Sequence, residues 1–133
     1  MAGRDAKAQD KQAQALRLAI EAARIARDRN CREILVLDLR ELSPVTDYFV
    51  IATGTSGRQM SAVTEEIRQN ARAMGHKAFR TAGAESADWI LIDFVDVVVH
   101  LFDEEHRRYY DLELIWGEAP RVDWQGESPP GAA

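Results

Sequence analysis

The chain has 133 residues, 46% of them hydrophobic and 29% charged, which is enough to form one domain with a buried core. No apolar run approaches the roughly 20 residues of a membrane-spanning helix, and residues 1–30 contain no apolar stretch typical of a secretory signal. The single cysteine, Cys31, excludes an internal disulfide and a zinc knuckle. We therefore expect a single-domain protein of the reducing cytoplasm.

The net charge of −5 is unevenly distributed along the chain. Residues 1–30 carry +3 and residues 31–84 carry +1, whereas residues 85–133 contain twelve acidic and three basic side chains and carry −9. A basic groove for nucleic acid would need the opposite bias, so we expect no direct sequence-specific binding of nucleic acid. The acidic C-terminal part suits a basic partner, although a solvated acidic surface would explain the same charge.

Hydrophobic periodicity and turn residues predict eight elements in the order α-β-β-α-β-β-β-α. Residues 1–9 are expected to be disordered, and residues 117–133, which contain three of the four prolines, are expected to form a flexible tail. Ser56 suits the N-cap of the second helix and Gly75 its C′ position. The predicted helices are 10–28, 57–74 and 103–116, and the predicted strands are 33–39, 48–53, 76–82, 89–94 and 97–102. This order indicates an α/β fold with a mixed sheet of about five strands flanked by helices.

The last two predicted strands form a hairpin whose two faces differ in chemistry. If Val95 and Asp96 form a two-residue loop, Phe94 lies opposite Val97, and side chains alternate between the two faces. One face is wholly apolar and must lie on the core. The other face combines aromatic side chains with one acid and one histidine: Trp89, Leu91, Asp93, Val98, His100 and Phe102. Either the C-terminal helix covers this face, or the face is partly exposed for binding with Trp89 as its anchor.

The turn Gly54-Thr55-Ser56-Gly57 joins a predicted strand to a helix, a position where backbone N–H groups can hold phosphate. It lacks the lysine of a P-loop and the glycine spacing of a Rossmann fold. The turn is similar to the element that opens the nucleotidyltransferase helix, but those enzymes also need two carboxylates on a following strand to hold magnesium. Residues 76–82 contain no acid, so we favour an ordinary capped turn and expect no enzymatic activity.

Four side chains in and near the hairpin are of types that bind metal ions, but their spacing does not indicate that they converge: Asp93, Asp96, His100 and His106. His100 and His106 lie on either side of a strand-to-helix boundary, so their side chains need not converge. No serine lies in a nucleophile elbow, and Cys31 has no apparent histidine partner. We therefore expect neither a metal nor another cofactor.

Several segments, in matching order and spacing, resemble one family of proteins, the ribosomal silencing factors, also called the Iojap or YbeB-like family. These segments are LR (39–40) with Ser43, TDYFVIATGTS (46–56) with RQ (58–59), SADWILID (86–93), DVVVHLF (96–102), and RRYYDLEL (107–114) with Trp116. The resemblance covers about residues 16–116 and defines a domain at 10–116. It implies a mixed sheet flanked by helices, distantly similar to nucleotidyltransferases but without their catalytic acids.

The resemblance also implies a translational repressor. Members bind one basic protein of the large ribosomal subunit, number fourteen, at the subunit interface and block joining of the small subunit. Organelle members are linked to ribosome assembly, so a large-subunit assembly factor is the alternative, and the family suggests a homodimer. In this chain the implied partner-binding residues, with Trp89 as apolar anchor and the aspartates facing Lys or Arg, are Trp89, Asp93, Asp96, His100, Tyr110 and Glu113.

Two positions depart from the family pattern. Val95 stands where the family usually has glycine before the aspartate of the hairpin turn, and a β-branched residue disfavours the positive φ of such turns. Ala82 stands where the family usually has glutamate before Gly83. If that glutamate contacts the ribosome in the family, this chain has lost the contact or makes it with another residue, for example Glu85.

Overall fold

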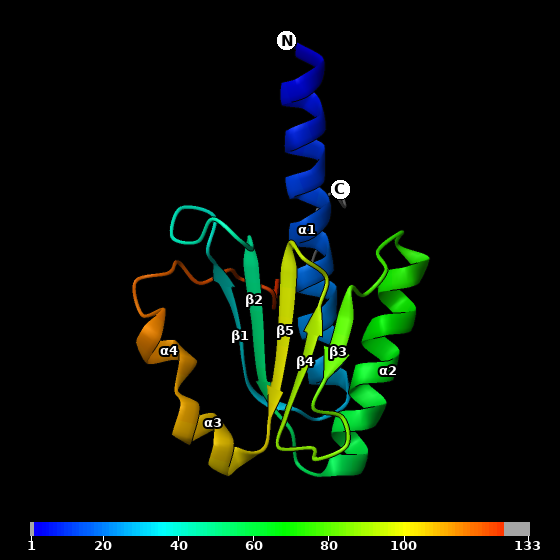
Figure 1. Ribbon diagram of the computed structural model, residues 1–133, viewed down its shortest axis with the longest axis vertical. Helices are drawn as coiled ribbons and strands as arrows, with labels where there is room; N and C mark the ends of the chain where they lie inside the picture. Colours follow the sequence, from blue (N-terminus) through cyan, green and yellow to red (C-terminus); the bar gives the residue numbers. More distant parts are fainter. Residues whose placement is uncertain (1, 127–133) are drawn as a thin grey trace.

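A five-stranded sheet forms the centre of the molecule, and its strands lie in the order β1-β2-β5-β4-β3 (Figure 1). The computed structural model describes residues 2–126, with side chains from residue 9 onward. The strands are β1 (Arg32–Asp38), β2 (Tyr48–Thr53), β3 (Arg80–Ala82), β4 (Trp89–Asp93) and β5 (Val97–Phe102). β2 and β5 run parallel, and the other neighbouring strands run antiparallel. The predicted mixed α/β sheet is therefore confirmed, with a shorter edge strand at β3.

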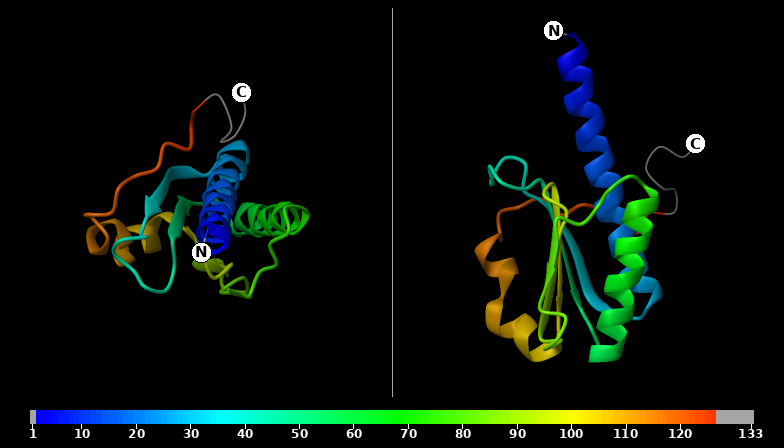
Figure 2. Two further views of the ribbon diagram at one scale, coloured as in Figure 1. Left: turned by 90° about the horizontal axis from the view of Figure 1, so that it is seen from above. Right: turned by 45° about the vertical axis from the view of Figure 1, so that its right-hand side comes forward.

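Helices cover the two faces of the sheet unequally (Figure 2). The long helices α1 (Ala2–Asp28) and α2 (Gly57–Ala73) pack on one face, and the short helices α3 (Glu104–Tyr110) and α4 (Leu112–Ile115) lie on the other. The prediction of disorder for residues 1–9 is wrong from Ala2 onward, because α1 begins there and extends past the sheet (Figure 1). No helix among residues 2–126 is long and apolar enough to span a bilayer.

The predicted C-terminal helix is divided into two by Asp111. This residue has a φ of 44°, in the left-handed region that aspartate tolerates better than most residues. It ends α3 and directly precedes α4, so the chain changes direction between the two helices. Helical periodicity at Tyr109, Leu112 and Trp116 did not reveal this break.

The main core lies between the sheet and the two long helices. Alanines of α1 lie against the sheet, and α2 contributes an apolar stripe. The buried residues of this stripe are Met60, Val63, Ile67 and Ala71. Ser56 caps α2 as predicted, because its Oγ accepts the Gln59 N–H at 3.0 Å, and Gly75 has a φ of 91° just after the helix.

A second, smaller apolar cluster lies on the opposite face of the sheet. Its buried members are Leu37, Leu39, Ile51, Phe102 and Ala119, and its partly buried members are Phe49, Trp89, Leu112 and Trp116. The short α3 and α4 cannot cover a five-stranded sheet, so part of this face stays accessible.

Residues 117–126, which we call the C-terminal strap, pack along β1, so the prediction of a flexible tail is wrong for them. The Asp38 N–H donates to the Pro120 carbonyl, and the Val122 N–H donates to the Val36 carbonyl, both at 2.8 Å. The side chain of Trp124 is buried in the main core, and its indole N–H donates to the Ile34 carbonyl at 3.3 Å. Residues 127–133 of the predicted tail lie outside the described part of the chain.

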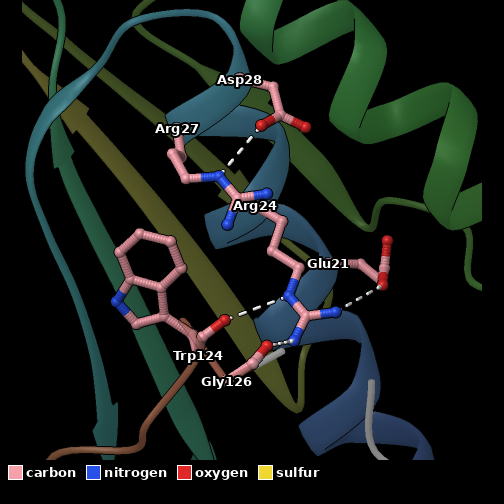
Figure 3. A network of polar contacts seen from close by, with 6 residues as sticks. All are labelled: Glu21, Arg24, Arg27, Asp28, Trp124 and Gly126. Atoms are coloured by element: carbon pink, nitrogen blue, oxygen red, sulfur yellow. Dashed lines mark hydrogen bonds and ion pairs between the residues drawn. The ribbon is translucent and has the colours of Figure 1, made fainter. Parts of the chain in front are cut away.

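A polar network from α1 holds the end of the strap (Figure 3). The Arg24 guanidinium donates from Nε to the Trp124 carbonyl at 3.1 Å and from Nη2 to the Gly126 carbonyl at 2.9 Å. The Arg27 guanidinium lies 5.9 Å from the centre of the Trp124 ring. The strap therefore joins the first helix to the edge of the first strand.

Candidate functional site

The hairpin of β4 and β5 has the predicted register, with Trp89 opposite Phe102 and Asp93 opposite Val98. Its apolar face is fully buried beneath the long helices. On the opposite face, Leu91, Asp93 and Val98 are partly exposed, whereas Phe102 is buried. The face is therefore covered at one end and partly exposed at the other: α3 covers the Trp89 end, and a partly exposed strip continues along β4 to Asp93.

Aromatic rings surround Trp89 and fix its position. Its indole lies 5.0 Å from the Phe102 ring and 4.5 Å from the Tyr110 ring, measured between centroids. Its Nε1–H donates to His100 Nδ1 at 3.1 Å. Tyr110, at the end of α3, keeps 39% of its surface exposed. Trp89 and Tyr110 thus form a rigid, partly exposed aromatic pair, a composition that is common at binding hot spots.

His100 lies behind this pair and is only 4% exposed. Because Nδ1 accepts the hydrogen bond from Trp89, the proton of the neutral ring lies on Nε2. Nε2 is buried and has no hydrogen-bond partner among the described residues. Burial disfavours the charged ring and lowers the pKa of His100 to about 4. His100 therefore supports Trp89 from within, and its side chain is not on the surface.

The depressed pKa of His100 should make the protein sensitive to acid. Between pH 6.5 and about 4 the unfolded chain binds a proton at His100 that the folded chain does not, so stability falls as the pH falls through this window. The loss should reach about 3 kcal/mol by pH 4. Urea titrations at pH 7 and pH 4.5 should show a smaller difference in the free energy of unfolding for His100→Phe than for the wild type. An equal difference in both proteins would contradict this assignment.

Asp93 and Asp96 lie at the other end of the hairpin from Trp89, about 14 Å along β4 at the usual rise per residue. The Asp93 carboxylate accepts the Val95 N–H at 2.8 Å and lies 3.8 Å from Arg80 Nε. Asp47 lies beside Asp96, and burial together with the charge of Asp96 raises the pKa of Asp47. This end of the sheet is therefore acidic.

Glu113 has an internal partner. Its carboxylate pairs with the guanidinium of Arg107, which is 5% exposed and also donates from Nη1 to Thr53 Oγ1 at 2.9 Å. Arg107 thereby connects α3 to the end of β2 and to α4. Sequence reasoning missed this role, because nothing in the sequence distinguishes Arg107 from the neighbouring Arg108, which is exposed.

The Gly54 turn lines a hollow of about 430 Å³, and the structure places acids beside it that were not expected from the sequence. Asp103 and Glu104 face the hollow because β5 runs parallel to β2, so the two strands end side by side. The turn itself is internally satisfied, since the Gln59 side chain accepts the Thr55 N–H at 2.6 Å. A Cβ at position 54 would collide with the Met60 side chain, so packing explains this glycine.

The four residues considered as a metal set do not come together. His106 lies beside Asp103 near the start of α3, while Asp93 and Asp96 lie at the opposite end of the hairpin. Among the described residues, one group brings potential metal ligands within 4.8 Å of one another: Asp88, Asp103 and His106. Helix capping accounts for much of this cluster, because Asp103 Oδ1 accepts the His106 N–H and lies 2.8 Å from His106 Nδ1. That contact raises the pKa of His106.

These features define a small mixed-sheet domain with one face covered by long helices and one half-open aromatic face with an acidic end. A family model described as "Ribosomal silencing factor during starvation" matches residues 11–133. The chain belongs to this family. The match includes the C-terminal strap, which the resemblance in the sequence analysis had left out.

Relatives of similar length support this assignment. The chain is 41% identical over 102 residues to "Ribosomal silencing factor RsfS" of Bacillus subtilis, covering 77% of this chain and 86% of the relative. It is 38% identical over 111 residues to the protein of the same name from Halalkalibacterium halodurans, covering 84% and 92%. A crystal structure of protein CV0518 from Chromobacterium violaceum has a TM-score of 0.70 and 35% identity, covering 77% of this chain and 83% of that one.

More distant relatives come from organelles. The chain is 33% identical over 123 residues to "Protein Iojap, chloroplastic" of Arabidopsis thaliana, covering 91% of this chain and 51% of the relative. It is 32% identical over 95 residues to "Mitochondrial assembly of ribosomal large subunit protein 1" of the mouse, covering 69% and 42%.

Proposed function

We propose that this protein is a cytoplasmic translational repressor that binds the large ribosomal subunit and blocks joining of the small subunit. The observation that carries the proposal is the half-open strip along β4, which leads from the aromatic pair Trp89 and Tyr110 to the acidic end at Asp93 and Asp96. The names of the bacterial relatives support the silencing role.

The chemistry of the strip suits a basic protein partner. An aromatic anchor supplies most of the binding free energy where it is desolvated, whereas carboxylates at the rim attract Lys and Arg and act mainly on the association rate. The implied partner is large-subunit ribosomal protein fourteen at the subunit interface. A domain of 133 residues bound there would occupy the space that the small subunit needs.

Replacing Trp89 with alanine should weaken binding to the large subunit roughly thirtyfold, or about 2 kcal/mol, because the exposed part of the anchor is lost. Purified protein is incubated with separated large and small bacterial subunits and sedimented through sucrose, and bound protein is quantified in each pellet. The wild type should pellet with the large subunit and prevent formation of joined ribosomes. Circular dichroism checks that the variant is folded, since Trp89 also contacts His100.

Asp96→Asn is the matched charge variant, because it removes one carboxylate charge from the partly exposed acidic end and keeps the size of the side chain. It should weaken binding only a fewfold, and less at high salt, because rim charges are screened. A wild-type protein that pellets with neither subunit at moderate salt would refute the proposal.

Assembly of the large subunit is a second candidate function, favoured by the printed name of the mouse relative. It would use the same surface on immature subunits. The assembly function would be favoured over silencing if a deletion strain accumulates large-subunit precursors while its mature subunits join as in the wild type.

We also propose that the protein acts by binding and not by catalysis. The capped, internally satisfied Gly54 turn supports this, while Asp103 and Glu104 beside the turn make a direct test worthwhile. Thermal unfolding with ATP or GTP and magnesium should give the same midpoint as without nucleotide. A reproducible nucleotide-dependent rise would favour the enzyme instead.

A further inference from the structure

The turn between β4 and β5 holds a β-branched residue in an unfavourable backbone conformation. Val95 has a φ of 74°, and the Asp96 N–H donates to the Phe94 carbonyl at 3.0 Å. This is a γ-turn with positive φ at its centre, which is rare and strained, and more so for valine than for glycine or asparagine.

Interior packing does not account for valine at this position. The side chain is 52% exposed, while its neighbour Phe94 is buried and pairs with Val97 through a 2.9 Å hydrogen bond. The backbone N–H of Val95 donates to the Asp93 carboxylate, a bond that any residue other than proline would make. The hairpin therefore needs a turn here, but not an isopropyl group.

The surroundings of Val95 are those of a contact surface. Asp93 lies two residues before it and Asp96 directly after it, and Asp47 lies beside Asp96. An exposed valine side chain thus lies among carboxylates at this end of the sheet.

We infer that Val95 is a contact residue for a Lys or Arg side chain of the basic ribosomal partner. The aliphatic stem of such a side chain would lie on Val95 while its charged head reaches the Asp93 and Asp96 carboxylates. Backbone strain persists where the surrounding structure enforces it, and it concentrates at functional sites. This inference rests on the proposed binding to the large subunit. It specifies one contact residue of this chain and the type of side chain that the partner places against it.

The test compares Val95→Gly and Val95→Asn with the wild type in thermal unfolding and in binding to large subunits. Both substitutes accept positive φ, so Val95→Gly should raise the melting temperature by roughly 3–8 °C. Both should weaken binding about fivefold or more, since each removes the apolar contact. Leu114→Ala on α4 is the control, because Leu114 is also largely exposed but lies on another element, and it should change affinity less than twofold.

Three results would each overturn one of these claims. Variants at position 95 that bind as tightly as the wild type would overturn the contact, even though large-subunit binding itself would stand. A lower melting temperature for Val95→Gly would overturn the assignment of strain. If the wild type does not bind large subunits, the proposed function fails, and the contact at Val95 fails with it.

Discussion

Replacing Arg107 with methionine should lower the free energy of unfolding by about 3–5 kcal/mol. The substitution leaves the partly buried Glu113 carboxylate without its cation and Thr53 Oγ1 without its donor. Because Arg107 connects α3 to β2 and α4, the loss should be concentrated in the layer that carries Tyr110. Urea denaturation gives the free energy, and hydrogen exchange should show faster exchange in α3 and α4 than in α1.

A double variant separates a lost ion pair from a lost packing contact. Arg107→Met with Glu113→Leu removes both charges, so it should recover much of the stability lost in the single variant. If the double variant is as unstable as the single one, the aliphatic packing of Arg107 stabilises the layer and the ion pair does not. Arg108→Met is the matched surface control and should change stability by less than about 0.5 kcal/mol.

Replacing Trp124 with alanine should also lower the free energy of unfolding by about 3–5 kcal/mol, which is the usual cost of truncating a buried tryptophan. The indole is 7% exposed and fills the space between α1 and the edge of β1. The variant also loses the contact of Arg27 with the ring and the indole hydrogen bond to the Ile34 carbonyl, so hydrogen exchange should accelerate in β1.

Gln125→Ala is the control for this experiment, because the neighbouring residue is exposed and its replacement should change stability by less than about 0.5 kcal/mol. A loss of under 1 kcal/mol for Trp124→Ala would mean that the strap adds little to the domain. In that case residues 117–126 would contribute as little to stability as the flexible tail predicted from the sequence.

Local signals in the sequence predicted most of the fold. Alternation along 89–102 with a two-residue loop fixed the register of the hairpin, and Ser56 and Gly75 marked the ends of α2 correctly. These features depend on neighbours within a few residues, so pattern reasoning reaches them.

Features that depend on distant neighbours were missed. The strap has prolines and no periodicity, and it is ordered because β1, more than 80 residues earlier, offers an edge and a cavity for Trp124. Asp103 reaches the Gly54 turn only because β2 and β5 pair in parallel. No local pattern shows such pairings.

Only part of the candidate site was predicted, because some of its features depend on strand alternation and others on contacts between distant segments. Trp89 and Asp93 share one face of the hairpin, as strand alternation requires. The burial of His100 and the pairing of Glu113 with Arg107 depend on how α3 and α4 lie over the sheet, and the break at Asp111 that sets their direction has no clear sequence signal.

The C-terminal strap also bears on how the protein is made. Ile34 and Trp124 are 90 residues apart in sequence, and Arg24 and Trp124 are 100 apart, yet each pair is joined by a hydrogen bond. Synthesis proceeds from the N-terminus, so the packing of α1 and β1 is incomplete until Trp124 has been synthesised. During translation the outer edge of β1 and the cavity for Trp124 stay open, and the native domain closes only after Trp124 has left the ribosome that made it.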